Sequence, residues 1–115
     1  MVVSFDDFKK LDLRTAKVLK VDDHPNADKL YLVTLDLGRD ETGKTIEKTV
    51  VAGIKQHYAK EEILGKTVVI VNNLEPAVIR GVVSEGMILA ASDTDKKILT
   101  VLTTDKPIDP ASKVS

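Results

Sequence analysis

Short runs of alternating apolar and polar residues, rich in β-branched side chains, constrain the fold of this chain most. In the segment 29–37 the apolar side chains share one face, as the two-residue period of a strand requires: Tyr31, Val33, Leu35 and Leu37. Similar runs, suited to strands, cover residues 13–21, 45–52, 66–72, 87–91 and 98–103. Only the short segments 5–11 and 56–64 have a helical pattern. The pattern therefore predicts an all-β fold with short helices.

The two expected helices have clear boundary signals. Ser4 is a favourable N-cap for the first helix, ahead of the acidic residues Asp6 and Asp7. We expect Phe5 and Phe8 to be core anchors of this helix. The second helix is expected to end at Gly65, since glycine commonly terminates helices.

The order of elements indicates a particular architecture. One helix, three strands, a short helix and then two or three further strands form the outline of a five-stranded oligonucleotide/oligosaccharide-binding (OB) barrel. The loop 38–43 predicts that strand 45–52 runs antiparallel to the strand before it. A chain of 115 residues forms one domain, so residues 1–115 are expected to comprise an N-terminal helix, the barrel and an extended C-terminal segment at 106–110.

Composition excludes several classes of protein. The chain has no cysteine, which rules out disulfides, thiolate metal sites and cysteine nucleophiles. No segment approaches the roughly 20 apolar residues of a membrane span, and the N-terminus lacks the features of a signal peptide. These features predict a soluble cytoplasmic protein without membrane contact.

No arrangement of residues supports catalysis, a metal or a cofactor. The loop with Asp22, Asp23, His24 and Asp28 does not have the spacing of a calcium site, so we interpret it as a solvated turn. We expect His24 and His57 to be surface residues. The Gly-x-Ser-x-Gly nucleophile motif and the glycine-rich phosphate motifs are both absent. The sequence therefore predicts a non-catalytic protein that needs no cofactor.

The segment 72–87 is the strongest candidate for a binding site. Its proline and glycines disfavour a sustained strand and indicate a shaped loop or a bulged strand. Asn73 and Ser84 can donate and accept hydrogen bonds, and Arg80 can bind phosphate through two parallel bonds or stack on a base. The alternative is that Asn73 stabilises its own turn and Arg80 is a solvated side chain.

Charge and aromatic content limit how nucleic acid could be bound. The formal net charge is −1, whereas a protein that binds nucleic acid by charge alone should be clearly basic. Only two phenylalanines and two tyrosines are present, and sequence-tolerant single-strand binding relies on aromatic stacking. Any nucleic-acid ligand is therefore expected to be a folded one, recognised by shape and backbone contacts.

Several motifs in one order resemble a known family. They are Leu11–Arg14, His24–Tyr31, Val50–Ile54, Asn73–Pro76 with Arg80–Gly81, and Ser84–Ala91, followed by a closing segment Pro107–Val114. Together they resemble the tRNA-binding domain family. Its members include the C-terminal domain of methionyl-tRNA synthetase, free-standing structure-specific tRNA-binding proteins, and the C-terminal half of the aminoacyl-synthetase cofactor that is processed to a cytokine.

The resemblance implies an OB barrel that binds the outer corner of tRNA by shape. Matched by position, the residues that it implies for tRNA binding are Asn73, Arg80, Ser84 and Met87, with Lys55 as a neighbour. It also implies a homodimer formed through segments outside the barrel, for which the first helix and the strand at 98–102 offer apolar surface. The domain would act as a free-standing protein, which the initiator Met1 favours, or as an appendage or partner of an aminoacyl-tRNA synthetase.

The chain departs from the family pattern at two positions. Many relatives have lysine where this chain has Glu75 and Val78. Residues 61–91 thus hold two basic residues (Lys66, Arg80) against four acidic ones (Glu61, Glu62, Glu75, Glu85). Fewer phosphate contacts predict weak, general tRNA binding with a shallow salt dependence. The alternative function is a protein-interaction role, as a dimeric export-associated chaperone or a scaffold of the same fold.

Overall fold

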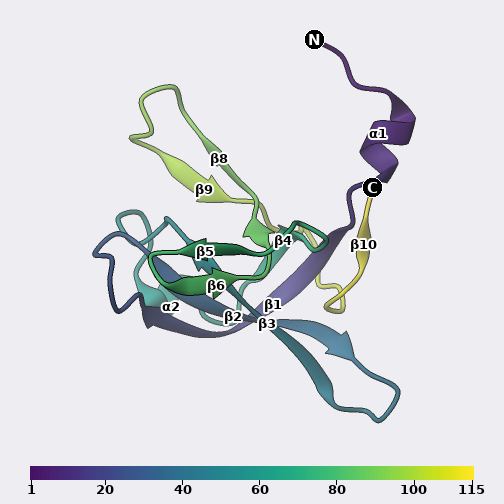
Figure 1. Ribbon diagram of the computed structural model, residues 1–115, viewed down its shortest axis with the longest axis horizontal. Coiled ribbons are helices and arrows are strands. Elements are labelled where there is room, and N and C mark those ends of the chain that lie inside the picture. Colours follow the sequence, from purple (N-terminus) through teal and green to yellow (C-terminus); the bar gives the residue numbers. More distant parts are fainter.

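The computed structural model describes residues 1–115 and is built around a curled antiparallel sheet (Figure 1). The helices are α1 (Phe5–Lys9) and α2 (Lys60–Ile63). The strands are β1 (Leu13–Asp23), β2 (Tyr31–Arg39), β3 (Thr45–Ala52), β4 (Thr67–Val71), β5 (Ala77–Ile79), β6 (Val82–Ser84), β7 (Met87–Ile88), β8 (Ala90–Ser92), β9 (Leu99–Val101) and β10 (Lys113–Val114). The predicted fold class, mostly β with short helices in an OB-like arrangement, is confirmed.

The main sheet curls around the long strand β1. Its strands lie in the order β3-β2-β1-β4-β7, and β10 also pairs with β1. The first part of β1 pairs with β4, whereas its second part pairs with β2, and the register shifts between Val18 and Lys20. Such an irregularity bends a strand and increases its twist. This bend lets one strand serve both halves of the barrel.

Side chains join the two ends of the sheet where the strand ladder stops. The backbone N–H of Val51 in β3 donates to Ser84 Oγ at 2.9 Å, and that of Thr49 donates to Glu85 Oε2 at 2.9 Å. The N–H of Glu85 donates in return to the Thr49 carbonyl at 3.0 Å. These three bonds satisfy backbone groups on the edge of β3 that would otherwise remain unpaired.

The core lies inside the curl and follows the predicted alternation. On β2 the residues Tyr31, Val33, Leu35 and Leu37 are buried, as the two-residue period predicts. Strands β1, β3, β4 and β9, helix α2 and the segment after β3 contribute apolar side chains to the same cluster: Ala16, Val18, Val21, Val50, Ala52, Ile54, Ile63, Val68, Ile70 and Val101.

Comparison with the expected elements gives a mixed result for the helices. Strand 45–52 is confirmed, and Ser4 caps α1 by accepting a hydrogen bond from the Asp7 N–H at 3.0 Å. The second helix is shorter than predicted, because residues 55–57 form a turn and residues 58–59 are irregular. The expectation that Phe5 and Phe8 anchor α1 in the core is wrong, since α1 buries no residue and projects from the barrel (Figure 1). No helix is long and apolar enough to cross a membrane.

The C-terminal extension returns to β1 through one threonine. The hydroxyl of Thr15 donates to the Asp109 carbonyl at 2.9 Å and accepts from the Ser112 N–H at 2.9 Å. The chain then forms β10, a two-residue strand that the sequence analysis did not predict. Thr15 lies in the predicted first strand, but its contacts with residues more than 90 positions away leave no local pattern.

Candidate functional site

The segment 72–87 contains a tight hairpin with Arg80 at its tip. Strands β5 and β6 pair from Ala77 to Ser84, with Ile79 opposite Val82. The two turn residues both have positive φ, 52° at Arg80 and 87° at Gly81. Two-residue hairpin turns of this kind need positive φ at both positions, which glycine adopts freely and arginine does not. Surrounding contacts must therefore stabilise the conformation of Arg80.

Those contacts come from the loop between β1 and β2. His24 is only 5% exposed, and its Nδ1 accepts the Asn26 N–H at 2.9 Å. Its Nε2 therefore carries the hydrogen and donates to the Ile79 carbonyl at 3.0 Å. The side-chain amide of Asn26 donates to the Arg80 carbonyl at 3.2 Å. The expectation of a surface His24 is thus wrong, because the ring links two backbone segments.

Ser84 lies at the base of the hairpin and is 4% exposed. Its hydroxyl donates to the Gly86 carbonyl at 3.1 Å while accepting from Val51. Both functions of the hydroxyl are thus used within the protein. Ser84 positions the end of β6 and the start of β7, and its side chain does not face solvent.

Asn73 is exposed and contacts the segment that connects α1 to β1. Its Oδ1 accepts from the Asp12 N–H at 2.8 Å, and its Nδ2 donates to the Lys10 carbonyl at 2.7 Å. Asn73 thus ties together segments about 60 residues apart in the chain, and not its own turn. Beside it, the hydrogen bond from Asn72 and then the ion pair with Arg14 keep the pKa of Asp12 below its ordinary value.

Lys55 lies outside the hairpin and is paired with an acid. Its ammonium group is 3.1 Å from Asp23 Oδ1, and that of Lys60 is 3.2 Å from Asp23 Oδ2. Hydrogen bonds from Lys55 and then Lys60 lower the pKa of Asp23, so the carboxylate stays charged. Part of the charge on Lys55 is therefore neutralised within the protein, whereas Arg80 forms no ion pair.

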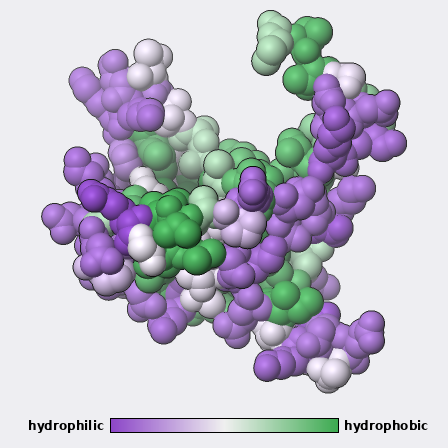
Figure 2. Space-filling view, in the orientation of Figure 1, coloured by the Kyte–Doolittle hydropathy of each residue, from purple (hydrophilic) through white to green (hydrophobic).

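Exposed apolar side chains on and beside the hairpin make up an apolar patch. Its members are Leu74, Val78, Val83 and Met87, and Figure 2 shows apolar surface gathered over β5 and β6. Val78 is 71% exposed and pairs with Val83 across the hairpin. Val78 and Val83 lie on one face of the hairpin, whereas Leu74 and Met87 line a hollow with Ile79, which points to its other face. The sequence analysis singled out Met87 and Val78 but missed Leu74 and Val83.

The structure thus brings some of the expected site residues together and separates others. Arg80, Ser84 and Met87 belong to the hairpin and the strand after it, whereas Asn73 and Lys55 contact other segments. No group of three or more histidines, aspartates and glutamates is arranged to bind a metal ion. The arrangement offers an exposed guanidinium, backbone groups and an apolar face, which are means of binding and not of catalysis.

Comparison with known proteins identifies the family. The sequence profile of the family described as "Putative tRNA binding domain" matches residues 13–113. The chain belongs to this family. It is a non-catalytic binding module, and the resemblance seen in the sequence is confirmed.

Similar sequences and solved structures support this assignment. The methionine–tRNA ligase of Nanoarchaeum equitans is 51% identical over 113 residues, which cover 98% of this chain and 14% of the ligase. The chain therefore spans about a seventh of that relative. A crystal structure of a MetRS-related protein from Pyrococcus horikoshii has a TM-score of 0.88 and 27% identity, covering 100% of this chain and 99% of that one. The chaperone CsaA from Bacillus anthracis has a TM-score of 0.84 and 26% identity, with 100% of both chains covered.

Proposed function

We propose that this domain binds folded tRNA on the rim formed by the β5–β6 hairpin and the loop 24–30. The supporting observation is Arg80, which is exposed at the hairpin tip, free of any ion pair and held by contacts from His24 and Asn26. An arginine fixed in this way suits the phosphate backbone of a folded RNA. In this proposal Arg80 and Met87 contact tRNA, Lys55 contributes from the side, and Ser84 and Asn73 position the backbone.

The biological setting proposed is aminoacylation by a methionyl-tRNA synthetase in the cytoplasm. The similarity to a segment of methionine–tRNA ligases favours a domain that is attached to such an enzyme or binds it in trans. An attached weak binder raises the local concentration of its ligand and can improve overall affinity by about 10²–10⁴. The domain therefore needs neither high affinity nor specificity of its own.

Replacing Arg80 by alanine is expected to weaken the binding of all tRNAs about equally. The loss of one phosphate contact should reduce the salt dependence of log K by roughly 0.7–0.9 per decade of salt. Filter binding of total tRNA and of two purified tRNAs, at several salt concentrations, measures both effects.

The matched control is Arg39→Ala. Arg39 is an exposed arginine at the far end of β2, where its side chain bonds to Thr45. The Arg39→Ala variant loses the same charge as Arg80→Ala, and its affinity for tRNA should be unchanged. An equal loss from both variants, or a loss for one tRNA only, would contradict a contact made by shape at the hairpin.

A second candidate function is protein binding, which the apolar patch favours. Val78 and Glu75 replace the lysines that the family resemblance leads us to expect, and a chaperone has nearly the same fold. The same filter-binding experiment separates the two functions. If tRNA is not bound at low salt by the unmodified protein, the protein-binding function is favoured.

We also propose that α1 and β10 form the contact between two copies of this chain. Phe5 is 72% exposed, and Phe8, Leu11 and Val114 line a hollow of about 290 Å³ between the helix and β10. The N-terminal residues Met1–Val3 add further exposed apolar surface, seen at the upper right of Figure 2. A helix of five residues with no fully buried side chain gains little stability from its own chain, so contact with a second copy would stabilise it.

The double variant Phe5→Ser, Phe8→Ser is expected to be monomeric at concentrations where the unmodified protein is dimeric. Two exposed aromatic side chains would supply much of the apolar area that a dimer buries. Light scattering coupled to size exclusion measures the mass of each variant. Leu64→Ser, which removes an exposed apolar residue directly after α2, is the control and should stay dimeric. A monomeric unmodified protein at high concentration would disprove the proposal.

A further inference from the structure

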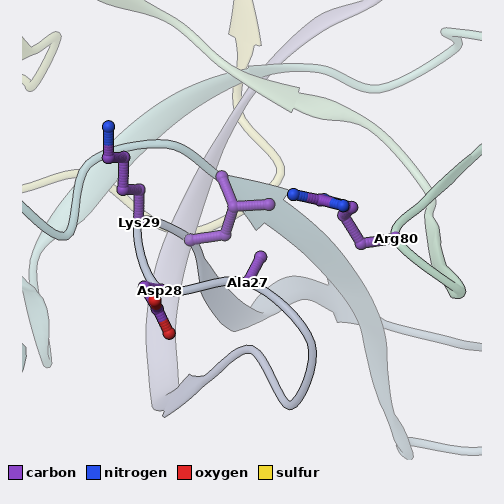
Figure 3. Close-up of a pocket in the computed structure, with 5 residues that line it drawn as sticks. Ala27, Asp28, Lys29 and Arg80 are labelled. Carbon is purple, nitrogen blue, oxygen red and sulfur yellow. The ribbon is translucent and has the colours of Figure 1, made fainter.

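A hollow of about 390 Å³ lies between the loop 24–30 and the tip of the β5–β6 hairpin (Figure 3). It is lined by Ala27, Asp28, Lys29, Leu30 and Arg80. Arg80 extends from the hairpin toward the loop, and the carboxylate of Asp28 points away from Arg80. The hollow thus combines small apolar surfaces with two cationic side chains and one carboxylate, so its lining stays net positive.

The walls of the hollow are held in place before any ligand arrives. The His24 and Asn26 hydrogen bonds connect the loop to the backbone carbonyls of Ile79 and Arg80. The Asn26 N–H bond to His24 fixes the loop itself. A binding site whose walls are already ordered loses less conformational freedom on binding.

The two cationic side chains at the hollow form no ion pair within the protein, so both can interact with a ligand. Neither Lys29 nor Arg80 is within ion-pair distance of a carboxylate, in contrast to Lys55 and Lys60, which share Asp23. A site with two unpaired cations favours an anionic ligand. The apolar side chains of Ala27 and Leu30 between them indicate that this ligand also has a flat or apolar part.

We propose that this hollow binds one unpaired nucleotide of an RNA. The base would lie against Leu30 and Ala27 beneath the plane of the Arg80 guanidinium, and the 5′-phosphate would lie near Lys29. The N–H groups at the edge of the same guanidinium would bond a neighbouring phosphate of the RNA, which is the phosphate contact proposed above for Arg80. A guanidinium stacks on flat rings as well as on aromatic side chains, and an ammonium group acts as a point charge for phosphate. The inference rests on the proposed function, because it names the part of a folded RNA that the rim recognises.

The site explains how a chain with so few aromatic residues can bind a base. Recognition of folded RNA targets bases that are not stacked in a helix, and arginine planes replace aromatic rings in stacking on them. One such nucleotide fixes the orientation of the RNA on the rim without reading an extended sequence.

A nuclear magnetic resonance titration of the ¹⁵N-labelled protein with adenosine 5′-monophosphate tests the proposal. We expect saturable shifts of the amides of residues 27–30 and 79–81. Inorganic phosphate and adenosine, added separately at the same concentration, should shift these amides much less. An equal response to phosphate alone would reduce the hollow to a simple anion site and overturn the proposal, as would shifts confined to other parts of the chain.

Variants separate stacking from charge. The Arg80→Lys variant retains the positive charge but lacks the planar guanidinium group. It should bind the nucleotide about tenfold more weakly, which is the effect of one lost stacking contact. Lys29→Ala should weaken it by a similar factor through the phosphate. Arg39→Lys is the matched control and should have no effect. Unchanged nucleotide affinity in Arg80→Lys would overturn the assignment of the base to this residue.

The failure of this proposal and that of the proposed function are distinguishable. If tRNA binds but the mononucleotide does not shift residues 27–30, the rim still binds RNA and the nucleotide site is disproved. If the mononucleotide binds at the hollow but tRNA does not bind, the nucleotide site is supported and the tRNA function is disproved.

Discussion

Replacing Gly86 by alanine is expected to destabilise the domain by about 1–3 kcal/mol, the cost of forcing extra volume into a packed interior. A Cβ on Gly86 would lie 3.0 Å from the Val71 carbonyl oxygen and 3.5 Å from Val50 Cγ1. The carbonyl belongs to the main chain of a core strand and cannot move aside as a flexible side chain could. Gly86 is also buried, so the added methyl group has no route to solvent.

The effect should extend to the closure of the barrel. Gly86 accepts the Ser84 hydroxyl hydrogen, and the same hydroxyl accepts the N–H of Val51 on β3. Displacing Gly86 therefore weakens the bonds that join β3 to the segment 84–85. Thermal unfolding followed by circular dichroism should show a melting temperature lower by about 4 °C or more.

Gly53→Ala is the matched control for this variant. Its added Cβ would lie 3.6 Å from Leu30 Cδ2, which is ordinary contact, and its φ is not positive. Its stability should change by no more than about 0.5 kcal/mol. If Gly86→Ala were as stable as Gly53→Ala, the close approach of Gly86 to Val71 would not constrain the fold.

Local periodicity explains which parts of the fold were predictable. The strand β3 was predicted to the residue, and the buried face of β2 follows from alternation alone. The strand β10 and the contacts of Thr15 were not predictable, because they depend on residues far away in the chain. The exposed phenylalanines of α1 were wrongly assigned to the core because spacing shows that residues share a face but not what covers it.

The same limit applies to the candidate site. Residue chemistry indicated Arg80, and the Arg80–Gly81 pair forms a tight turn that suits its exposure. Residue chemistry also indicated Ser84 and Asn73, whose hydrogen bonds are used within the protein. The sequence alone does not distinguish a polar loop residue that contacts a ligand from one that forms hydrogen bonds within the protein. His24 was missed for that reason, since only the folded chain brings Ile79 within reach of its ring.

Replacing His24 by alanine is expected to weaken both stability and tRNA binding. The change removes the acceptor for Asn26 and the donor to Ile79, and each backbone group that stays unsatisfied costs about 1–3 kcal/mol. Without these bonds the positive φ of Arg80 loses support, and a non-glycine residue in that conformation costs about 1–2 kcal/mol. Urea unfolding measures the stability, and filter binding of total tRNA, at a temperature where the variant stays folded, measures the affinity.

Two conservative variants separate the roles of the ring nitrogens. The amide of His24→Asn places an acceptor near the position of Nδ1, and the amide of His24→Gln places a donor near that of Nε2. If contact with Ile79 orients Arg80, His24→Gln should retain more tRNA affinity than His24→Asn, and hydrogen exchange at Gly81 and Val82 should rank the variants in the same order. His57→Gln is the control, because the ring of His57 forms no hydrogen bond. Equal affinities for the two conservative variants, with different exchange rates, would show that His24 stabilises the hairpin without orienting Arg80 toward RNA.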